Sequence, residues 1–245
     1  MEWWEKYFGK DYLILYPPES QSETISDNID FIIRELNIPK GGRILDLCCG
    51  YGRHSLLFAK YGYQVVGYDL SNDLLEYAKS RNNGPGIIYQ QGDMRSLPYR
   101  NEFHGIVNLS TSLGFFKNDA ENELVIQQVA NALRPGGRFL LDHWNPEKVH
   151  FPGSIKNWRE NPEGNDVILE IYERDLLRNR LRAKKILHHE GERREYYFDV
   201  RIYSPAELTS ILSRHGLHVL NIYGNFRNEP LTSTSARMVF VALKE

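Results

Sequence analysis

A glycine-rich turn follows a short apolar segment in the stretch Ile44-Leu45-Asp46-Leu47-Cys48-Cys49-Gly50-Tyr51-Gly52-Arg53-His54. Gly50 and Gly52 let the backbone turn tightly and approach a ligand at a distance that a Cβ atom would prevent. In an open α/β sheet, ligands bind at the carboxyl ends of the strands, which is where this turn lies. Such a turn can also be a simple connection, so its meaning depends on the rest of the chain.

Strand-like and helix-like segments alternate around this turn. Short apolar runs predict strands at 43–48, 64–68, 87–90, 105–109 and 138–142, and helical spacing predicts helices at 24–36, 53–60, 72–81 and 121–133. Near-continuous apolar strands that alternate with helices indicate a parallel sheet covered on both faces. We therefore expect an α/β core.

The pattern changes after Trp144. Three strand-like segments, at 167–172, 181–187 and 196–203, follow one another without a helix between them. This indicates an antiparallel insertion of roughly 50–60 residues. A helix at 205–215 and strands at 217–223 and 237–243 then return to the core.

The predicted fold is a Rossmann-like seven-stranded sheet, mostly parallel with an antiparallel last strand, flanked by helices and carrying a small antiparallel β insertion after strand five. We expect residues 1–40 to form an aromatic N-terminal segment and helix that acts as a lid. Residues 41–145 and 204–245 would form the cofactor-binding core, and residues 146–203 the inserted subdomain.

Two aspartates follow the glycine turn at the ends of the next predicted strands. A carboxylate at Asp69, which ends the second strand, can accept hydrogen bonds from both hydroxyls of a ribose. Its alternative role as a helix cap is weakened because Ser71 already lies where that cap is expected. Asp93 ends the third strand, where it can accept a hydrogen bond from an adenine amino group while Met94 packs on the ring. By itself, such an aspartate is more often a turn residue.

Both NAD and S-adenosylmethionine fit a glycine turn followed by a ribose-binding carboxylate. The dinucleotide fingerprint requires a third glycine near the pyrophosphate, and this chain has Ser55 there. The closing strands after Leu217 also differ from the second half of a dinucleotide fold. A cofactor without a pyrophosphate is favoured over NAD.

Several motifs together resemble those of class I S-adenosylmethionine-dependent methyltransferases: Asp46-Leu47-Cys48-Cys49-Gly50-Tyr51-Gly52, Asp69, Gly92-Asp93-Met94, Asn108-Leu109-Ser110 and Leu133-Arg134-Pro135-Gly136-Gly137. The resemblance runs from about residue 41 to residue 144. Within the family, the chain is most similar to small-molecule methyltransferases, including the amino-sugar N,N-dimethyltransferases of macrolide pathways. Those share the inserted layer and an N-terminal Tyr-x-x-x-Tyr, matched here by Tyr12 and Tyr16.

The resemblance implies a cofactor site in which Asp46 and Gly50 hold the methionine moiety, Asp69 holds the ribose, and Asp93 with Met94 holds the adenine. The backbone near Asn108 would take the methionine amino group. The full set of expected cofactor-binding residues is Tyr16, Asp46, Cys48, Gly50, Gly52, Asp69, Leu70, Asp93, Met94, Asn108 and Leu109.

Tyr16 and His143 are the candidate catalytic residues, because both are expected at the rim where an acceptor would lie. The alternatives are aromatic packing for Tyr16 and a hydrogen-bonded strand-end histidine for His143. The candidate acceptor-binding residues are Tyr12, His143, Trp144, Arg201, Tyr203 and Asn225.

The overall charge favours a small acceptor. The chain has 30 Lys and Arg against 32 Asp and Glu, for a net charge of −2, whereas nucleic-acid binding usually requires a broad basic surface. The segment 174–201 is locally basic, which fits either a solvated sheet face or attraction of an anionic acceptor. We therefore predict methyl transfer to N or O of a small molecule. An RNA methyltransferase and a non-catalytic cofactor-binding protein remain the alternatives.

Cysteine usage and hydropathy indicate a cytoplasmic protein. The two adjacent cysteines cannot form a disulfide framework and lack metal-ligand spacing, so no metal site is predicted. No stretch approaches the roughly 20 apolar residues of a membrane-spanning helix. Six of the 30 aromatic residues fall in the first 16 positions, and we expect these rings to cover the methyl-transfer pocket.

Overall fold

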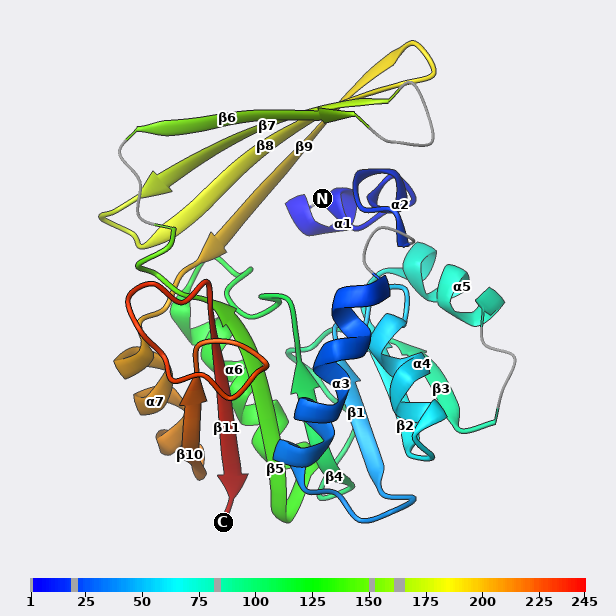
Figure 1. Cartoon of the computed structure of the whole chain (residues 1–245), viewed down its shortest axis with the longest axis vertical. Helices are drawn as coiled ribbons and strands as arrows, with labels where there is room; N and C mark the ends of the chain where they lie inside the picture. The colour runs from blue at the N-terminus through cyan, green and yellow to red at the C-terminus, as the bar shows by residue number, and fades with distance from the viewer. Residues whose placement is uncertain (1, 19–21, 82–84, 150–152, 161–165) are drawn as a thin grey trace.

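The computed structural model describes the chain except residues 1, 19–21, 82–84, 150–152 and 161–165. Its core is a seven-stranded sheet (Figure 1) in the order β10-β11-β5-β4-β1-β2-β3. The strands are β1 (Arg43–Leu47), β2 (Gln64–Asp69), β3 (Ile87–Gln91), β4 (Phe103–Asn108), β5 (Leu133–Trp144), β10 (Leu217–Tyr223) and β11 (Arg237–Lys244). Strands β1 to β5 pair in parallel, and β11 runs antiparallel to both of its neighbours. The predicted fold class is confirmed.

Helices cover both faces of this sheet. They are α3 (Ser22–Leu36), α4 (Arg53–Lys60), α5 (Asn72–Arg81), α6 (Asp119–Ala132) and α7 (Pro205–Arg214). Strand residues alternate between the two faces: Ile44 packs in one cluster with Ile32 of α3 and Phe58 of α4, while Leu45 packs in another with Val129 of α6 and Leu212 of α7. This two-sided burial explains why the strands are almost continuously apolar.

The topology creates a crevice next to β1. From β1 the chain proceeds outward through β2 to β3, and then returns to form β4 on the other side of β1. The connections after β1 and β4 therefore leave in opposite directions, and the carboxyl ends of these strands lie at one edge of the sheet. The glycine-rich turn follows β1 at this edge.

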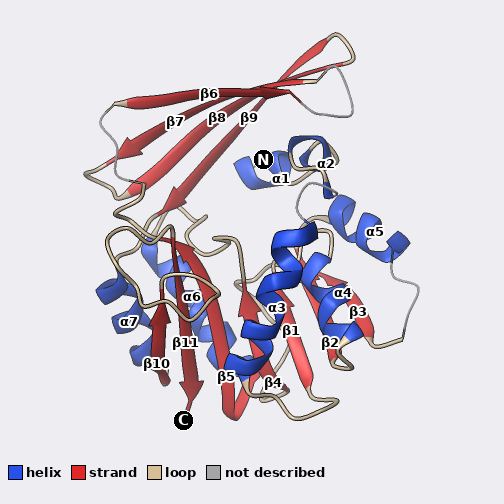
Figure 2. Cartoon of the chain, viewed as in Figure 1, coloured by secondary structure: helices blue, strands red, loops and turns tan. Residues whose placement is uncertain are grey.

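A second sheet lies above that edge (Figure 2) and contains β6 (Ser154–Glu160), β7 (Val167–Asp175), β8 (Arg180–His189) and β9 (Glu192–Arg201), all antiparallel and in chain order. The sequence predicted only the last three of these strands. Strand β6 was missed because it is a mostly exposed edge strand with the polar sequence Ser-Ile-Lys-Asn-Trp-Arg-Glu. Its structure comes from pairing with β7 rather than from an alternating apolar pattern.

The N-terminal segment contains two short helices, α1 (Trp3–Tyr7) and α2 (Tyr12–Leu15), that were not predicted. They pack beneath the second sheet, where Tyr7 and Leu15 share a buried cluster with Ile168 and Tyr196. Helices of four and five residues are too short to show helical periodicity. Their shape depends on aromatic contacts with the sheet.

No helix in the described part of the chain is long and apolar enough to cross a membrane.

A glycine joins the core to the second sheet. The carbonyl oxygen of Gly114 accepts a hydrogen bond of 2.8 Å from the backbone N–H of Arg201, at the end of β9. Gly114 has a φ of +105°, and a Cβ atom there would lie 2.5 Å from the Arg201 carbonyl oxygen. The close approach of these two backbones therefore requires glycine.

Replacing Gly114 by alanine should destabilise the fold by about 3 kcal/mol, because backbone strain and a clash with backbone atoms add together. The matched control is Gly136→Ala, at a φ of +76° with no atom within 4 Å of the added Cβ, for which we expect a loss of about 1 kcal/mol. Urea unfolding of both variants measures the difference. Equal losses would contradict the proposed close packing at Gly114.

Candidate active site

The carboxylate of Asp69 organises the turn after β1. Its two oxygens accept hydrogen bonds of 2.8 Å from the backbone N–H groups of Gly50 and Ser71. Gly50 has a φ of +55°, and the nearest atom to a Cβ added there would be 3.9 Å away, on Leu74. The turn is thus held in shape by Asp69 while the space beside Gly50 stays open.

Ser71 connects this turn to two other segments. Its hydroxyl oxygen accepts a hydrogen bond from the backbone N–H of Leu74, which makes Ser71 the cap of α5 as the sequence indicated. The same hydroxyl donates to the carbonyl oxygen of Phe8 at 2.6 Å. The N-terminal segment is therefore tied directly to the loop that carries Asp69.

Asp46 is buried in β1, directly before the turn. Only 2% of it is exposed, and its carboxylate accepts a hydrogen bond of 2.6 Å from the hydroxyl of Ser55. Ser55 occupies the position where a dinucleotide fold has its third glycine. In this chain the Ser55 side chain instead donates its hydroxyl hydrogen bond to Asp46. Burial raises the pKa of Asp46 to about 6, although the Ser55 hydrogen bond acts in the opposite direction.

Asp93 is engaged by a neighbouring arginine. Its carboxylate accepts hydrogen bonds from the Arg95 guanidinium, the shortest at 2.6 Å, and Arg95 also bonds to Glu121. Burial acts to raise the pKa of Asp93, but these hydrogen bonds lower it overall. A ligand at Asp93 would therefore meet a charged carboxylate that already has a partner.

Cys48 and Met94 lie together on the cavity wall. The Cys48 sulfur is 3.4 Å from the Met94 sulfur, and burial raises the pKa of the Cys48 thiol well above its usual value. Both cysteines are free thiols. Cys48 has a φ of +62°, which a non-glycine residue rarely adopts. The left-handed backbone of the turn therefore begins at Cys48, two residues before Gly50.

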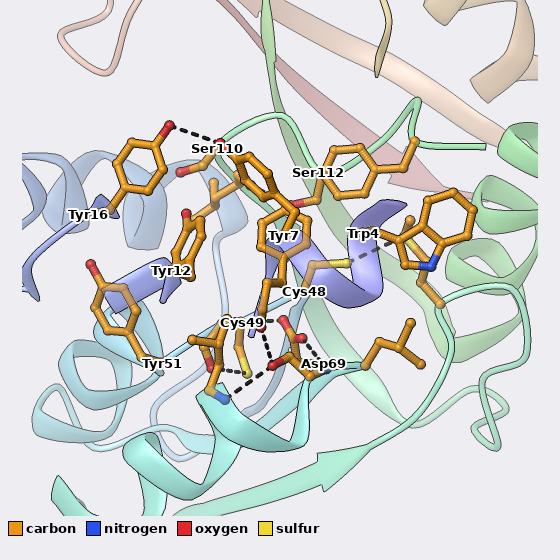
Figure 3. A pocket seen from close by; sticks show the side chains of 18 of the residues that line it. Trp4, Tyr7, Tyr12, Tyr16, Cys48, Cys49, Tyr51, Asp69, Ser110 and Ser112 are labelled. Atoms are coloured by element: carbon orange, nitrogen blue, oxygen red, sulfur yellow. Dashed lines mark hydrogen bonds between the residues drawn. The ribbon is translucent and has the colours of Figure 1, made fainter. Parts of the chain in front are cut away.

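A large cavity separates the edge of the core sheet from the second sheet. Its volume is about 1310 Å³. Its floor is formed by the turn after β1 and by the loops that follow β2, β3 and β4, and the tyrosines of α1 and α2 stand opposite Asp69 (Figure 3). We call the inner face of the second sheet, which contributes Tyr172, Ala183, Lys185 and Phe198, the roof.

Aromatic rings pack against one another along the cavity wall between floor and roof. The Tyr12 and Tyr16 rings are 4.9 Å apart, and the Trp3 and Phe198 rings are 5.2 Å apart. The hydroxyl oxygens of Tyr7 and Tyr16 are 3.1 Å apart. Twelve of the predicted site residues line this cavity: Tyr12, Tyr16, Asp46, Cys48, Gly50, Asp69, Leu70, Asp93, Met94, Leu109, Trp144 and Asn225.

Five other predicted residues, Gly52, Asn108, His143, Arg201 and Tyr203, are not among the lining residues. His143 is fully buried, its Nδ1–H donates to the Trp144 carbonyl oxygen, and burial lowers its pKa to about 4. Arg201 instead pairs with Glu207 at the start of α7, and the Tyr203 hydroxyl donates to Asp119. The catalytic role of His143 stays an untested prediction.

The polar residues that the second sheet brings to the cavity were not predicted from the sequence. Lys185 lies on the roof, at a position where the alternation through Leu181, Ala183 and Leu187 would place an apolar residue. That break in the pattern was the available signal. Ser110 belongs to one of the quoted motifs but was not assigned to the site: it lines the floor with a φ of +60°, and its hydroxyl oxygen accepts a hydrogen bond of 2.8 Å from Arg53.

Burial of Asp46 predicts a pH-dependent stability difference. Because its pKa rises to about 6 on folding, from an ordinary value of 3.8, the folded state retains a proton that the unfolded chain releases. The resulting stabilisation is complete below pH 4 and is lost as the pH rises through 6. Between pH 4 and 7.5, Asp46→Asn should therefore gain about 3 kcal/mol of unfolding free energy relative to the native chain.

Urea unfolding at several pH values measures this difference, with the exposed Asp30→Asn as the matched control. A difference between Asp46→Asn and the native chain that stays constant with pH would contradict a raised pKa at Asp46.

Comparisons with known proteins find similarity over part of the sequence and over most of the fold. Residues 44–137 match the methyltransferase domain family. The chain is 30% identical over 136 residues to dTDP-3-amino-3,4,6-trideoxy-alpha-D-glucopyranose N,N-dimethyltransferase from Streptomyces venezuelae, covering 56% of this chain and 52%, about half, of that protein. It is 25% identical to cypemycin N-terminal methyltransferase from a Streptomyces species, covering 83% of this chain and 84% of that protein.

A solved structure extends the similarity to nearly the whole fold. The CcbJ methyltransferase from Streptomyces caelestis has a TM-score of 0.83, with 20% identity and coverage of 98% of both chains. At this identity the comparison shows a shared fold, including the second sheet. Residues 44–137 therefore match a methyltransferase domain, within a fold that the chain shares with a known methyltransferase.

Proposed function

We propose that the protein transfers a methyl group from S-adenosylmethionine to the amine of a small molecule. The observation that carries this proposal is the single cavity that runs from the Gly50–Asp69 turn to an aromatic roof. Small-molecule pockets usually have volumes of about 300–1,000 Å³. The cavity of about 1310 Å³ therefore has room for a cofactor together with an acceptor.

The floor residues fit this cofactor. A carboxylate at the end of β2, open space beside Gly50, and the apolar side chains of Leu70 and Met94 suit a ribose, a methionine chain and an adenine ring. We assign the ribose to Asp69, the methionine moiety to Asp46 and Gly50, and the adenine to Asp93 with Met94. When bound, this cofactor supplies an electrophilic methyl group on a positively charged sulfur.

The chain's own contribution is to position the acceptor and to exclude water. Alignment of reactants can supply up to about 7–11 kcal/mol in ideal intramolecular systems. The rings of Tyr12, Tyr16 and Phe198 line the cavity above the floor, and we place the acceptor beside the Tyr16 hydroxyl. We assign Tyr16 to the acceptor side for this reason.

An amine is favoured over a hydroxyl because a neutral amine needs no base at the moment of attack, whereas a hydroxyl benefits from one. His54 is the one histidine among the described residues that line the cavity, and burial lowers its pKa to about 3. It is therefore a weak base. The names of two relatives also support an amine, since one is an amino-sugar N,N-dimethyltransferase and the other an N-terminal methyltransferase.

The direct test is incubation of the protein with S-adenosylmethionine labelled in the methyl group and a panel of nucleotide-linked and free amino sugars, followed by mass identification of the product. We expect label on nitrogen. Label on oxygen or on RNA would contradict the proposed acceptor, and cofactor binding without transfer to any compound of a metabolite extract would favour a non-catalytic role.

Asp69→Ala should weaken S-adenosylhomocysteine binding about tenfold to a hundredfold, because charge-assisted hydrogen bonds to Asp69 contribute about 1.5–3 kcal/mol each. Calorimetric titration measures this affinity. Glu76→Gln removes an exposed carboxylate from the same region and should leave the affinity unchanged. An unaltered affinity in Asp69→Ala would contradict the assigned ribose site.

A further inference from the structure

A lysine lies in the middle of the roof with almost no exposure to solvent. Lys185 is 2% exposed, lines the cavity, and is paired in register with Glu170 on β7 and Tyr196 on β9. Removing an ammonium group from water costs several kcal/mol unless hydrogen bonds and an opposite charge compensate. The partners of Lys185 therefore show what the charge is used for.

Those partners come from two separate parts of the chain. The Lys185 ammonium donates a hydrogen bond of 2.5 Å to Glu170 and another to the hydroxyl oxygen of Tyr16. It also lies 4.5 Å from the centre of the Tyr16 ring and 5.7 Å from that of Tyr172. Lys185 thus links the second sheet to the tyrosine that directly follows α2.

The chemistry of an ammonium group sets the direction of this contact. An ammonium donates three hydrogen bonds and accepts none, so the Tyr16 oxygen must accept from Lys185. The Tyr16 hydroxyl proton is then directed elsewhere, either to the Tyr7 oxygen at 3.1 Å or into the cavity. Glu170 holds the ammonium from the other side. The Tyr16 oxygen is thus held in place as the acceptor of the Lys185 hydrogen bond.

The sheet itself does not need this charge. Strand β8 pairs along its whole length with β9, and over most of it with β7, through backbone hydrogen bonds. Apolar residues of similar volume often replace a buried ion pair without loss of stability. A second pair, Lys184 with Glu195, lies on the opposite and more exposed face of the same sheet.

We propose that Lys185, held by Glu170, is a positioning residue for methyl transfer that fixes the Tyr16 hydroxyl beside the acceptor. This inference rests on the proposed function, because Tyr16 matters to catalysis only if the cavity holds an acceptor. The proposal gives the inserted sheet a part in positioning Tyr16, in addition to enclosing the cavity.

The test compares Tyr16→Phe, the double variant Lys185→Met/Glu170→Leu, and the triple variant. Misplacement of a reacting group by about 1 Å can cost about a hundredfold in rate. We therefore expect kcat to fall at least about tenfold in Tyr16→Phe and in the Lys185→Met/Glu170→Leu double variant. The triple variant should be no slower than the slower of the two. The double variant should keep the melting temperature and the S-adenosylhomocysteine affinity of the native chain. Lys184→Met/Glu195→Leu is the matched control and should keep native kcat.

Two outcomes would overturn the proposal: native kcat in the Lys185 double variant, or rate losses that multiply in the triple variant. A readout that needs no acceptor separates this proposal from the proposed function. In protein labelled with ¹³C at the tyrosine ring carbon that bears the hydroxyl, the Tyr16 resonance, identified by its loss in Tyr16→Phe, should shift in the Lys185 double variant and not in the Lys184 control. An unshifted resonance would overturn the proposal even if methyl transfer is demonstrated.

Discussion

The two hydrogen bonds accepted by the Asp69 carboxylate are the interactions on which the site depends. One fixes Gly50 in the turn after β1, and the other fixes Ser71 at the start of α5. Ser71 then binds the carbonyl oxygen of Phe8 through its hydroxyl. A single side chain at the end of β2 thereby connects the floor of the cavity, a helix of the core and the N-terminal segment that lines the cavity.

The charges around the cavity suit the transfer of a methyl group from a cationic donor to a neutral acceptor. The floor carries the buried carboxylate of Asp46 and the half-buried carboxylate of Asp69, and the roof carries a compensated pair, Lys185 with Glu170. Aromatic rings, including those of Tyr7, Tyr12, Tyr16 and Phe198, line the cavity between them. Methyl transfer to an amine moves a positive charge from donor to acceptor without creating a new one, so alignment and exclusion of water contribute more than proton transfer.

The core could be predicted from the sequence because its strands are buried on both faces and its helices are amphipathic, so apolar spacing records the structure directly. The floor of the site followed from the glycine turn and the strand-end aspartates. Strand β6 and helices α1 and α2 could not be predicted, since their conformation comes from contacts with other segments. Lys185 and Tyr16 are 169 residues apart, and no local pattern relates them.

A crystal structure with bound S-adenosylhomocysteine tests the central claim most directly, because that claim is a matter of orientation within one cavity. The account predicts ribose hydroxyls within hydrogen-bond distance of Asp69, adenine beside Met94, and the sulfur facing Tyr16 and the roof. A sulfur atom that faces away from the roof, or a cofactor bound outside this cavity, would contradict it.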